Sequence, residues 1–183
     1  MQLLVLKFCY TVRGGEQMTR YYQIQLPVNG QLTWLAGTAT QLVFVGTPGN
    51  EQDMSNNLIP TVSFMTKKTP FFVAAAQKIS RYLTGQSEIF DVPVLFLSGT
   101  PLQQRVWQAL TTVPYGTQLT YSDLAQQVGY PKAVRAVATA VAKNPLLFVV
   151  PCHRVVRKDG SAGQYRGGVD LKRHLLTMEQ QNR

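Results

Sequence analysis

The chain has few of the residues that build disulfide frameworks, metal sites or membrane helices. It contains 183 residues, with 2 cysteines and 2 histidines. Cys9 and Cys152 stand far apart, which argues against a disulfide framework, and the cysteines and histidines show no recognisable zinc spacing. No apolar run approaches the roughly 20 residues of a membrane helix, and no signal-peptide cleavage site is visible. We therefore expect a cytoplasmic protein with no metal, no cofactor and no membrane contact.

Acidic residues are also scarce, because 9 Asp and Glu stand against 18 Lys and Arg. The imbalance is uneven. Residues 96–183 hold eleven basic and four acidic residues, whereas residues 1–95 hold seven and five. A polyanion is therefore the expected partner of the C-terminal half, although an ordinary solvated basic surface explains the charge equally well.

The first half of the sequence has the alternation that is typical of strands, followed by one helix. The helix is expected from Phe71 to Leu83, with Gly85 closing it. Turn residues separate four expected strands, which span residues 3–12, 21–26, 31–36 and 41–45. Cys9 falls in the first of them and is expected to be a passive residue.

The second half is expected to be mostly helical. Thr100, Pro101 and Gln103 form a capping-box start for a first helix. A second helix is expected over residues 121–128 and a third over residues 132–143, separated by a Gly-Tyr-Pro break. Two helices across a tight turn form a helix-turn-helix, which occurs both in DNA-binding proteins and as a plain structural corner.

The third expected helix has one polar and one apolar face. At about 100° per residue, the valines at positions 134, 137 and 141 lie together, opposite a stripe that would meet phosphate groups. The small residues beside the arginine would let the helix approach a narrow groove closely. The residues expected to contact DNA here are Lys132, Arg135, Ala136, Thr139 and Lys143.

Cys152 is the candidate nucleophile. It precedes His153 and follows the apolar run Leu146–Val150, which we expect to be a buried strand that holds the sulfur rigidly. A thiol attacks as its thiolate, so its pKa of roughly 8.5 has to fall, and nearby cations would lower it. Candidates are His153, Arg154, Arg157 and Lys158. Taken alone, however, a Cys-His pair is more often a core cysteine beside a histidine.

The wider pattern around Cys152 closely resembles the O6-alkylguanine-DNA alkyltransferases, over about Thr100 to Glu179. Many motifs keep their order and spacing around this single cysteine, whereas residues 1–95 show little likeness. The motifs are Gln104-Arg105-Val106-Trp107, Val113-Pro114-Tyr115-Gly116, Thr120-Tyr121, Gly129-Tyr130-Pro131, Ala133-Val134-Arg135-Ala136-Val137, Asn144-Pro145, Pro151-Cys152-His153-Arg154-Val155-Val156, Gly163-Gln164-Tyr165, Gly167-Gly168 and Lys172 to Glu179.

The resemblance implies DNA repair by irreversible, stoichiometric transfer of the alkyl group from O6-alkylguanine, and from O4-alkylthymine, to Cys152. The damaged nucleotide in double-stranded DNA would be flipped out through the minor groove, with Arg135 filling the gap. His153 would take the thiol proton through a water, oriented by Glu179, and Tyr121 would promote flipping and protonate the leaving guanine. Pocket residues would be Asn144, Val155, Gly163, Tyr165 and Arg166.

The resemblance also implies an α+β protein of two domains, acting as a monomer. Residues 1–95 would form a ribonuclease-H-like domain of a sheet and helices. Residues 96–183 would form a mostly helical domain with the helix-turn-helix and the active site. Two rival functions stay open: a non-catalytic lesion sensor or DNA-binding regulator, and a cysteine hydrolase, although a hydrolase's base is seldom the residue next to its cysteine.

Overall fold

The chain has a mixed α+β fold, and the computed structural model describes residues 20–28, 31–57, 64–86 and 91–182. Its larger sheet has the order β3-β2-β1-β4. Strands β1 (Tyr21–Val28), β2 (Gln31–Gly37) and β3 (Leu42–Val45) pair antiparallel, and β4 (Phe64–Thr66) pairs parallel with β1. The strands predicted over residues 21–26, 31–36 and 41–45 are confirmed. The strand predicted over residues 3–12, with Cys9, lies outside the described residues.

Two helices accompany this sheet. Helix α2 (Pro70–Leu83) confirms the prediction: Thr69 caps its start, and Gly85 follows its end with a φ of 71°, in the left-handed region that glycine adopts readily. Helix α1 (Asp53–Asn57) and strand β4 were not predicted. Elements of five and three residues are too short to show a periodic pattern.

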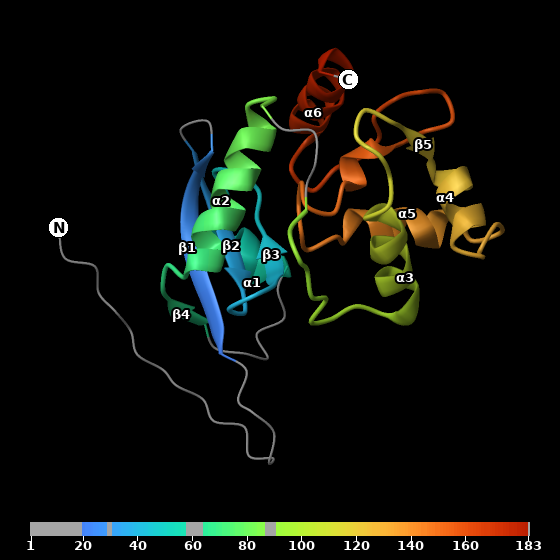
Figure 1. Ribbon diagram of the computed structural model, residues 1–183. Coiled ribbons are helices and arrows are strands. Elements are labelled where there is room, and N and C mark those ends of the chain that lie inside the picture. The colour runs from blue at the N-terminus through green and yellow to red at the C-terminus, as the bar shows by residue number, and fades with distance from the viewer. Residues whose placement is uncertain (1–19, 29–30, 58–63, 87–90, 183) are drawn as a thin grey trace.

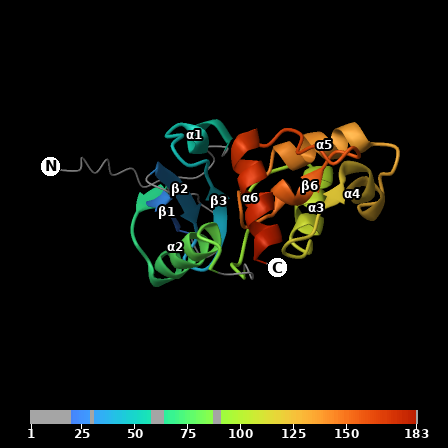
Figure 2. The same cartoon turned by 90° about the horizontal axis from the view of Figure 1, so that it is seen from above.

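Over residues 91–182, the second half contains four α-helices and a small parallel pair of strands. The helices are α3 (Pro101–Leu110), α4 (Tyr121–Gln127), α5 (Val134–Ala142) and α6 (Val169–Gln181). The strands are β5 (Leu119–Thr120) and β6 (Val155–Val156). In Figure 1 the sheet, α1 and α2 lie in the left part of the molecule, and α3, α4 and α5 lie in the right part. Seen from above, α6 lies between these two groups (Figure 2).

Local capping explains where the helices start. The capping box of Thr100 and Gln103 is present in full, and Thr120 and Asp123 form a second one at α4. The prediction that α5 begins at Lys132 was wrong, because residues 131–132 form a turn and the helix begins at Val134. The Ala133 N–H donates to the Tyr130 carbonyl, and Ala133, the N-cap residue, has no side chain to cap the helix.

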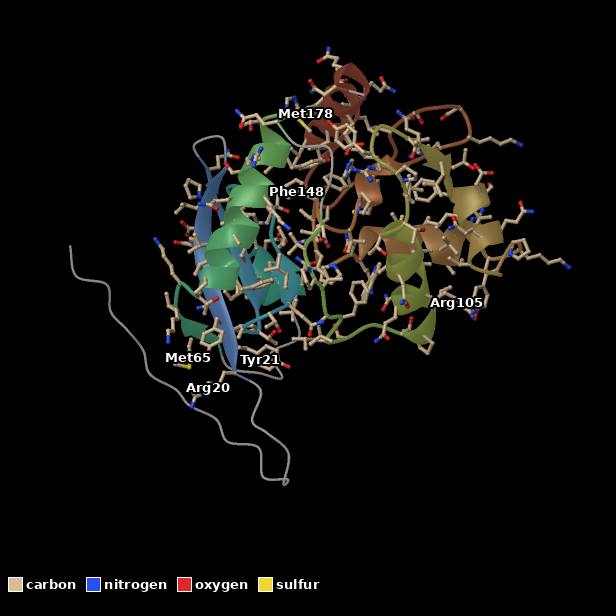
Figure 3. The ribbon with its side chains drawn as sticks, in the orientation of Figure 1. Arg20, Tyr21, Met65, Arg105, Phe148 and Met178 are labelled. Atoms are coloured by element: carbon tan, nitrogen blue, oxygen red, sulfur yellow. The ribbon has the colours of Figure 1, made fainter. Side chains whose placement is uncertain are left out.

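The predicted buried strand over Leu146–Val150 is also wrong, although its burial is confirmed. Only Leu146 makes a strand-like bridge, to Val45. After it the chain turns back on itself: the Val150 N–H donates to the Leu146 carbonyl, and Phe148 has a φ of 68°. This conformation is rare and strained for a bulky residue. Figure 3 labels Phe148 in the interior of the molecule.

One apolar core runs through both halves of the described chain. It joins Leu35 and Phe72 of the first half to Val106, Val137 and Leu175 of the second. Because the halves share this core, side chains of the first half lie within reach of Cys152 and its neighbours. Within the described ranges, no helix combines the length and apolar character needed to span a bilayer.

Candidate active site

Cys152 lies at the start of a one-turn 3₁₀ helix, Cys152–Arg154, and its side chain is buried. Burial raises the pKa of its thiol above the ordinary value, because a thiolate is poorly solvated there. An N–H of Asn144 lies 3.0 Å from the sulfur, and this contact and the charges of Arg166 and Lys172 act in the opposite direction. The resting cysteine is therefore a neutral thiol that needs a base.

The cations around the sulfur differ from those expected. Arg166 and Lys172 lower the pKa of Cys152, whereas Arg154 is committed to Glu179. Arg157 lines a surface cleft instead. Sequence proximity was a poor guide here, because the 3₁₀ turn and the loops after it decide which charges face the sulfur.

His153 and Glu179 form a buried pair, with 2.9 Å between the histidine Nε2 and the glutamate Oε1. Glu179 comes from α6, one helical turn after Leu175, which anchors this helix in the core. The Arg154 guanidinium donates to both oxygens of Glu179, from Nε to Oε2 at 2.9 Å and from Nη2 to Oε1 at 2.8 Å. The Gly116 N–H also donates to Oε2, at 3.1 Å. The carboxylate is therefore fixed in place by several donors.

These contacts determine the protonation of the pair. Burial alone would raise the pKa of Glu179, but hydrogen bonds from His153, Arg154 and Tyr82 lower it to about 2. Burial lowers the pKa of His153, more than the Glu179 contact raises it, so the imidazole is neutral at neutral pH. Because an ionised carboxylate only accepts, His153 carries its proton on Nε2. Its Nδ1 is buried and has no hydrogen-bond partner among the described residues, which leaves a lone pair ready to accept a proton.

A residue of the first half also reaches this pair, and the sequence analysis missed it. The Tyr82 hydroxyl of α2 donates to Glu179 Oε1 at 2.5 Å and lies 3.0 Å from His153 Nε2. Tyr82 lies in the helix expected from Phe71 to Leu83, but the sequence indicated no role for it. No local signal distinguishes it, since the residues that it contacts lie 71 and 97 positions away.

Asn144 shapes the segment before the cysteine. Its side chain accepts from the Leu146 N–H at 2.9 Å and donates to the Val150 carbonyl at 2.9 Å. With the contact to the Cys152 sulfur, one amide group thus connects the end of α5 to both ends of the turn that carries the candidate nucleophile. These hydrogen bonds take the place of the backbone hydrogen bonds that a neighbouring strand would have made to this segment.

Tyr121, at the start of α4, lies near both Cys152 and the glycine-rich loop, which spans residues 160–168. Burial and the neighbouring Cys152 raise the pKa of its hydroxyl, which therefore stays protonated. A side chain at Gly163 would meet this hydroxyl, because a Cβ placed there lies 3.3 Å from it, and the φ of 68° also favours glycine. Lys172 lies below the Tyr121 ring, 5.9 Å from its centroid, and donates to the Val155 carbonyl at 2.6 Å.

Arg166 lies close enough to act on Cys152, and its guanidinium extends toward the first half of the chain. Its guanidinium pairs with Asp53 at 2.5 Å and donates to the Val45 carbonyl at 2.8 Å. The neighbouring Tyr165 is buried, with its ring edge-on to His153 at 6.3 Å between centroids. The loop is therefore attached on both sides, to the first half through Arg166 and to the histidine through Tyr165.

A surface cleft of about 470 Å³ lies over this region. It is bordered by α5, Tyr121 and the glycine-rich loop, and Cys152 lies buried beside it rather than in its lining. The lining residues are Tyr121, Val134, Arg135, Ala138, Thr139, Ala142, Lys143, Arg157, Gly163 and Gln164. The cleft thus gathers Tyr121, Gly163 and three of the residues expected to contact DNA, whereas Lys132, Ala136, Asn144, Val155, Tyr165 and Arg166 do not line it.

The two faces of α5 differ as the sequence indicated, except that Val134, expected on the packed face, is half-buried and lines the cleft. Arg135, Ala136 and Thr139 are exposed, and Val137 and Val141 are buried. Lys132 and Lys143 are exposed just outside the helix ends. The Trp107 indole N–H donates to the Ala140 carbonyl at 2.8 Å, so α3 fixes the position of α5 from behind. The basic face is therefore presented on a rigid support.

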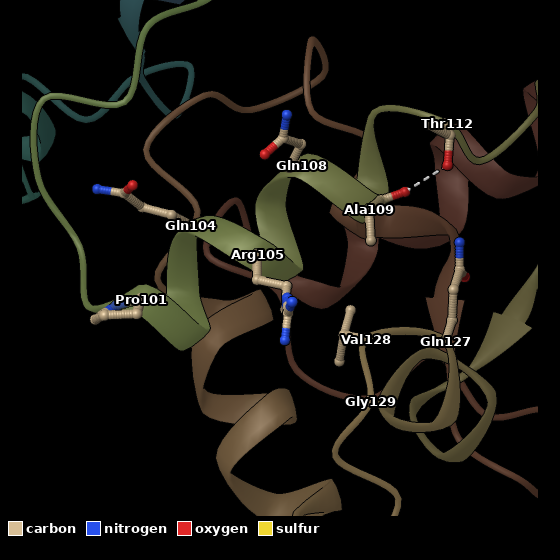
Figure 4. A pocket seen from close by; sticks show the side chains of 9 residues that line it. All are labelled: Pro101, Gln104, Arg105, Gln108, Ala109, Thr112, Gln127, Val128 and Gly129. Atoms are coloured by element: carbon tan, nitrogen blue, oxygen red, sulfur yellow. Dashed lines mark hydrogen bonds between the residues drawn. The ribbon is translucent and has the colours of Figure 1, made fainter.

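A second hollow, of about 760 Å³, lies beside α3 and near the end of α4 (Figure 4). Arg105 projects into it, and its guanidinium lies 5.9 Å from the ring centroid of Tyr130. None of the predicted site residues lines this hollow. Across the described part of the chain, no group of three or more His, Cys, Asp or Glu side chains is placed to hold a metal ion.

Comparisons with known proteins agree on one family. The family model described as "6-O-methylguanine DNA methyltransferase, DNA binding domain" matches residues 101–181. A methylated-DNA--protein-cysteine methyltransferase of Mycobacterium bovis is 39% identical over 162 residues, which cover 88% of this chain and 93% of the relative. The constitutive enzyme of that name from Bacillus subtilis is 45% identical over 114 residues, or 62% of this chain and 68% of the relative.

Solved structures give the same answer. The crystal structure of the O6-methylguanine methyltransferase of Mycobacterium tuberculosis aligns with a TM-score of 0.74 and 32% identity, covering 89% of this chain and 94% of that one. The Mycobacterium tuberculosis protein OGT in complex with DNA aligns with a TM-score of 0.73 and 35% identity over the same shares. The similarity thus extends over the first half, where the sequence showed little likeness.

Proposed function

Because the chain belongs to the methylated-DNA--protein-cysteine methyltransferase family, we propose that Cys152 accepts the alkyl group of O6-alkylguanine in DNA. The protein is a DNA-repair methyltransferase that acts on double-stranded DNA. The observation that carries the role of Cys152 is its place beside His153, whose Nδ1 is available while Nε2 is held by Glu179. Cys152 is also the free cysteine of the described chain, and it is buried next to the cleft.

The transfer begins with a neutral thiol, and the base is His153. A water that bridges the Cys152 sulfur and Nδ1 carries the proton to the imidazole, which becomes a cation facing the ionised Glu179. The sulfur then attacks the alkyl carbon. A carbon–sulfur bond forms as the carbon–O6 bond breaks, and the electron pair of that bond passes to the guanine. Glu179 stays ionised throughout, because its donors hold its pKa far below neutrality.

The leaving guanine needs a hydrogen-bond donor that meets its developing negative charge, and the Tyr121 hydroxyl supplies it. Its hydroxyl remains protonated at neutral pH and lies at the cleft, beside Gly163. A donor aimed at the developing negative charge stabilises it where water is excluded. Backbone groups of Val155 and of the loop from Gly163 would contact the flipped base. The side chain of Asn144 is bonded to Leu146, Val150 and the Cys152 sulfur. Its role in the pocket would therefore be to hold Cys152 in position.

Nucleotide flipping is assigned to Arg135. Flipping costs a few kcal/mol of lost stacking and pairing, less at a lesion that pairs poorly. Arg135 is exposed at the cleft with the small residues Ala138 and Ala142 along the same helix, so the backbone of α5 can approach the groove closely. Lys132, Ala136, Thr139 and Lys143 would contact the DNA backbone, without the Asn and Gln side chains that commonly read bases.

We also propose the finer architecture. Residues 1–95 form a ribonuclease-H-like domain, supported by the mixed sheet β3-β2-β1-β4 with α2 packed on it. Residues 96–183 form the DNA-binding and active-site domain, in which α4 and α5 make a helix-turn-helix supported by their mutual packing. The two domains pack against each other through this shared apolar core.

The product fixes the stoichiometry. A thioether has no ionisable proton and is a poor leaving group, so no side chain near Cys152 can restore the thiol. One protein molecule would repair one lesion. O4-alkylthymine presents an alkyl carbon on an exocyclic oxygen in a similar way and is the second expected substrate.

Intact-mass measurement tests the proposal directly. Purified protein is incubated with a duplex that contains one O6-methylguanine, beside the variant Cys152→Ala and an undamaged duplex. We expect a stoichiometric gain of one methylene mass in the unchanged protein alone, with lesion binding retained by the variant. Binding without any mass gain would instead indicate a lesion sensor. The absence of both binding and mass gain would refute a role in this repair.

A further inference from the structure

The first half of the chain supplies one side chain to the buried His153–Glu179 pair, and that side chain is Tyr82. We propose that Tyr82 is a positioning residue for alkyl transfer, whose hydroxyl, bonded to both Glu179 and His153, holds the imidazole in the orientation in which the lone pair on Nδ1 can act as the base. The inference rests on the proposed function and adds to it, because it gives the first domain a part in the chemistry.

Three polar atoms meet on the side of the imidazole opposite Nδ1: the Tyr82 hydroxyl oxygen, Glu179 Oε1 and His153 Nε2. The Tyr82 oxygen lies 2.5 Å from Glu179 Oε1 and 3.0 Å from His153 Nε2, and those two atoms are 2.9 Å apart. All three side chains are at most 1% exposed. Water therefore does not compete for these atoms, and each hydrogen bond restricts the others.

The hydroxyl can act here only as a protonated group. Burial and the charge of Glu179 raise the pKa of Tyr82 well above its ordinary value. Between the two polar atoms described here, the ionised carboxylate of Glu179 is a much stronger acceptor than a neutral imidazole nitrogen. The hydroxyl proton therefore points to Glu179, and Nε2 cannot receive it. Nε2 must carry its own proton, which leaves Nδ1 as the basic atom.

Arg154 alone would not secure this arrangement. It donates to Glu179 through Nε and Nη2, but it makes no hydrogen bond to His153 among the described contacts. Tyr82 contacts both members of the pair. Its ring also packs at a tilt against the imidazole, with 6.3 Å between centroids, so ring and hydroxyl together limit rotation of His153.

Packing and positioning can be separated by removing the hydroxyl alone. Tyr82→Phe keeps the ring in the core, and Tyr22→Phe is the matched control, because it removes a hydroxyl from another buried tyrosine of the same apolar cluster. In single-turnover transfer at saturating lesion duplex, we expect Tyr82→Phe to slow the rate constant about 10-fold, the size typical for loss of a residue that orients a reacting group. Duplex affinity and the fraction of protein that reacts should not change, since Tyr82 does not line the cleft.

Nitrogen-15 NMR of the two histidines gives the second readout. His174 lies exposed on α6 and serves as an internal reference in the same spectrum. His153 should show the single Nε2–H form in the unchanged protein and in Tyr22→Phe. In Tyr82→Phe the Nε2–H form should persist, because Glu179 still accepts from it, but the His153 signals should shift as the hydrogen bond to the Tyr82 hydroxyl is lost, while those of His174 stay in place.

The outcomes distinguish the two proposals. Failure of the unchanged protein to transfer the alkyl group would refute the proposed function. Normal transfer, with Tyr82→Phe equal to it in rate constant and His153 spectrum, would overturn the role of Tyr82 alone. A smaller reacting fraction at an unchanged rate constant would also overturn it, because that result means only that some of the variant is misfolded.

Discussion

Arg166 and Asp53, 113 residues apart in the sequence, form a buried ion pair at 2.5 Å between guanidinium and carboxylate. Their side chains are 9% and 2% exposed. Arg166 also donates to the Asn144 and Val45 carbonyls. The glycine-rich loop of the proposed base pocket is therefore attached to the first half of the chain.

Asp53→Asn should destabilise the protein by about 3 kcal/mol, because breaking a buried pair leaves a guanidinium without its counter-charge. Urea unfolding measures the change. Asp170→Asn is the control: its partner Arg173 is 70% exposed, and loss of such a surface pair should cost less than about 1 kcal/mol. Equal effects of the two variants would show that the buried pair has no special weight.

Glu179→Gln should slow alkyl transfer about 100-fold, because the neutral amide no longer stabilises the imidazolium of His153. The variant should also unfold more easily, since Arg154 would remain buried without a negative partner. Rapid-quench assays and urea unfolding measure the two effects. Glu51→Gln, which changes an exposed residue, should alter neither.

Acid should destabilise the protein in two windows. The pKa of His153 is lowered in the folded state, so the unfolded chain takes up a proton first, and stability begins to fall as the pH drops below about 6.5. The pKa of Glu179 is about 2 when folded, so its contribution is complete above the unfolded value of about 4.5 and is lost as the pH falls toward 2. Unfolding free energies from pH 8 to pH 2 would show both, and Glu179→Gln should remove the lower window. A flat profile down to pH 5 would contradict the buried neutral histidine.

Arg135→Ala should slow repair of a duplex lesion about 10-fold or more, because nothing then fills the gap left by the flipped nucleotide. Reaction with free O6-benzylguanine base, which needs no flipping, should be unaffected. Arg173→Ala, which removes an exposed charge of α6, controls for net charge. Equal losses with duplex and free base would assign Arg135 to the chemistry rather than to flipping.

Methylated Cys152 should lower the melting temperature. The sulfur is buried and in contact with Asn144, and an added methyl group in a packed site costs about 1–3 kcal/mol. Protein exposed to an undamaged duplex is the control. Identical melting of reacted and unreacted protein would mean that the site already has room for the group.

Some of the fold was predictable from local signals. The capping box of Thr100 and the glycine after α2 act over four residues or fewer, so the helix boundaries that they set agree with the structure. The segment before Cys152 was misjudged, because a short buried apolar run looks the same as a strand or as a turn. Its conformation depends on Asn144, whose amide bonds replace a neighbouring strand.

The sequence by itself determined the family and marked Cys152 and His153 as the proposed nucleophile and its base, because these depend on residue types at fixed spacings around Cys152. Only the tertiary structure decided which groups surround the thiol. Burial raises its pKa, Arg166 and Lys172 rather than Arg154 act on it, and Tyr82 joins Glu179 at the imidazole. These effects arise between residues far apart in the chain, and their strength depends on distance and on exclusion of water, which only folding creates.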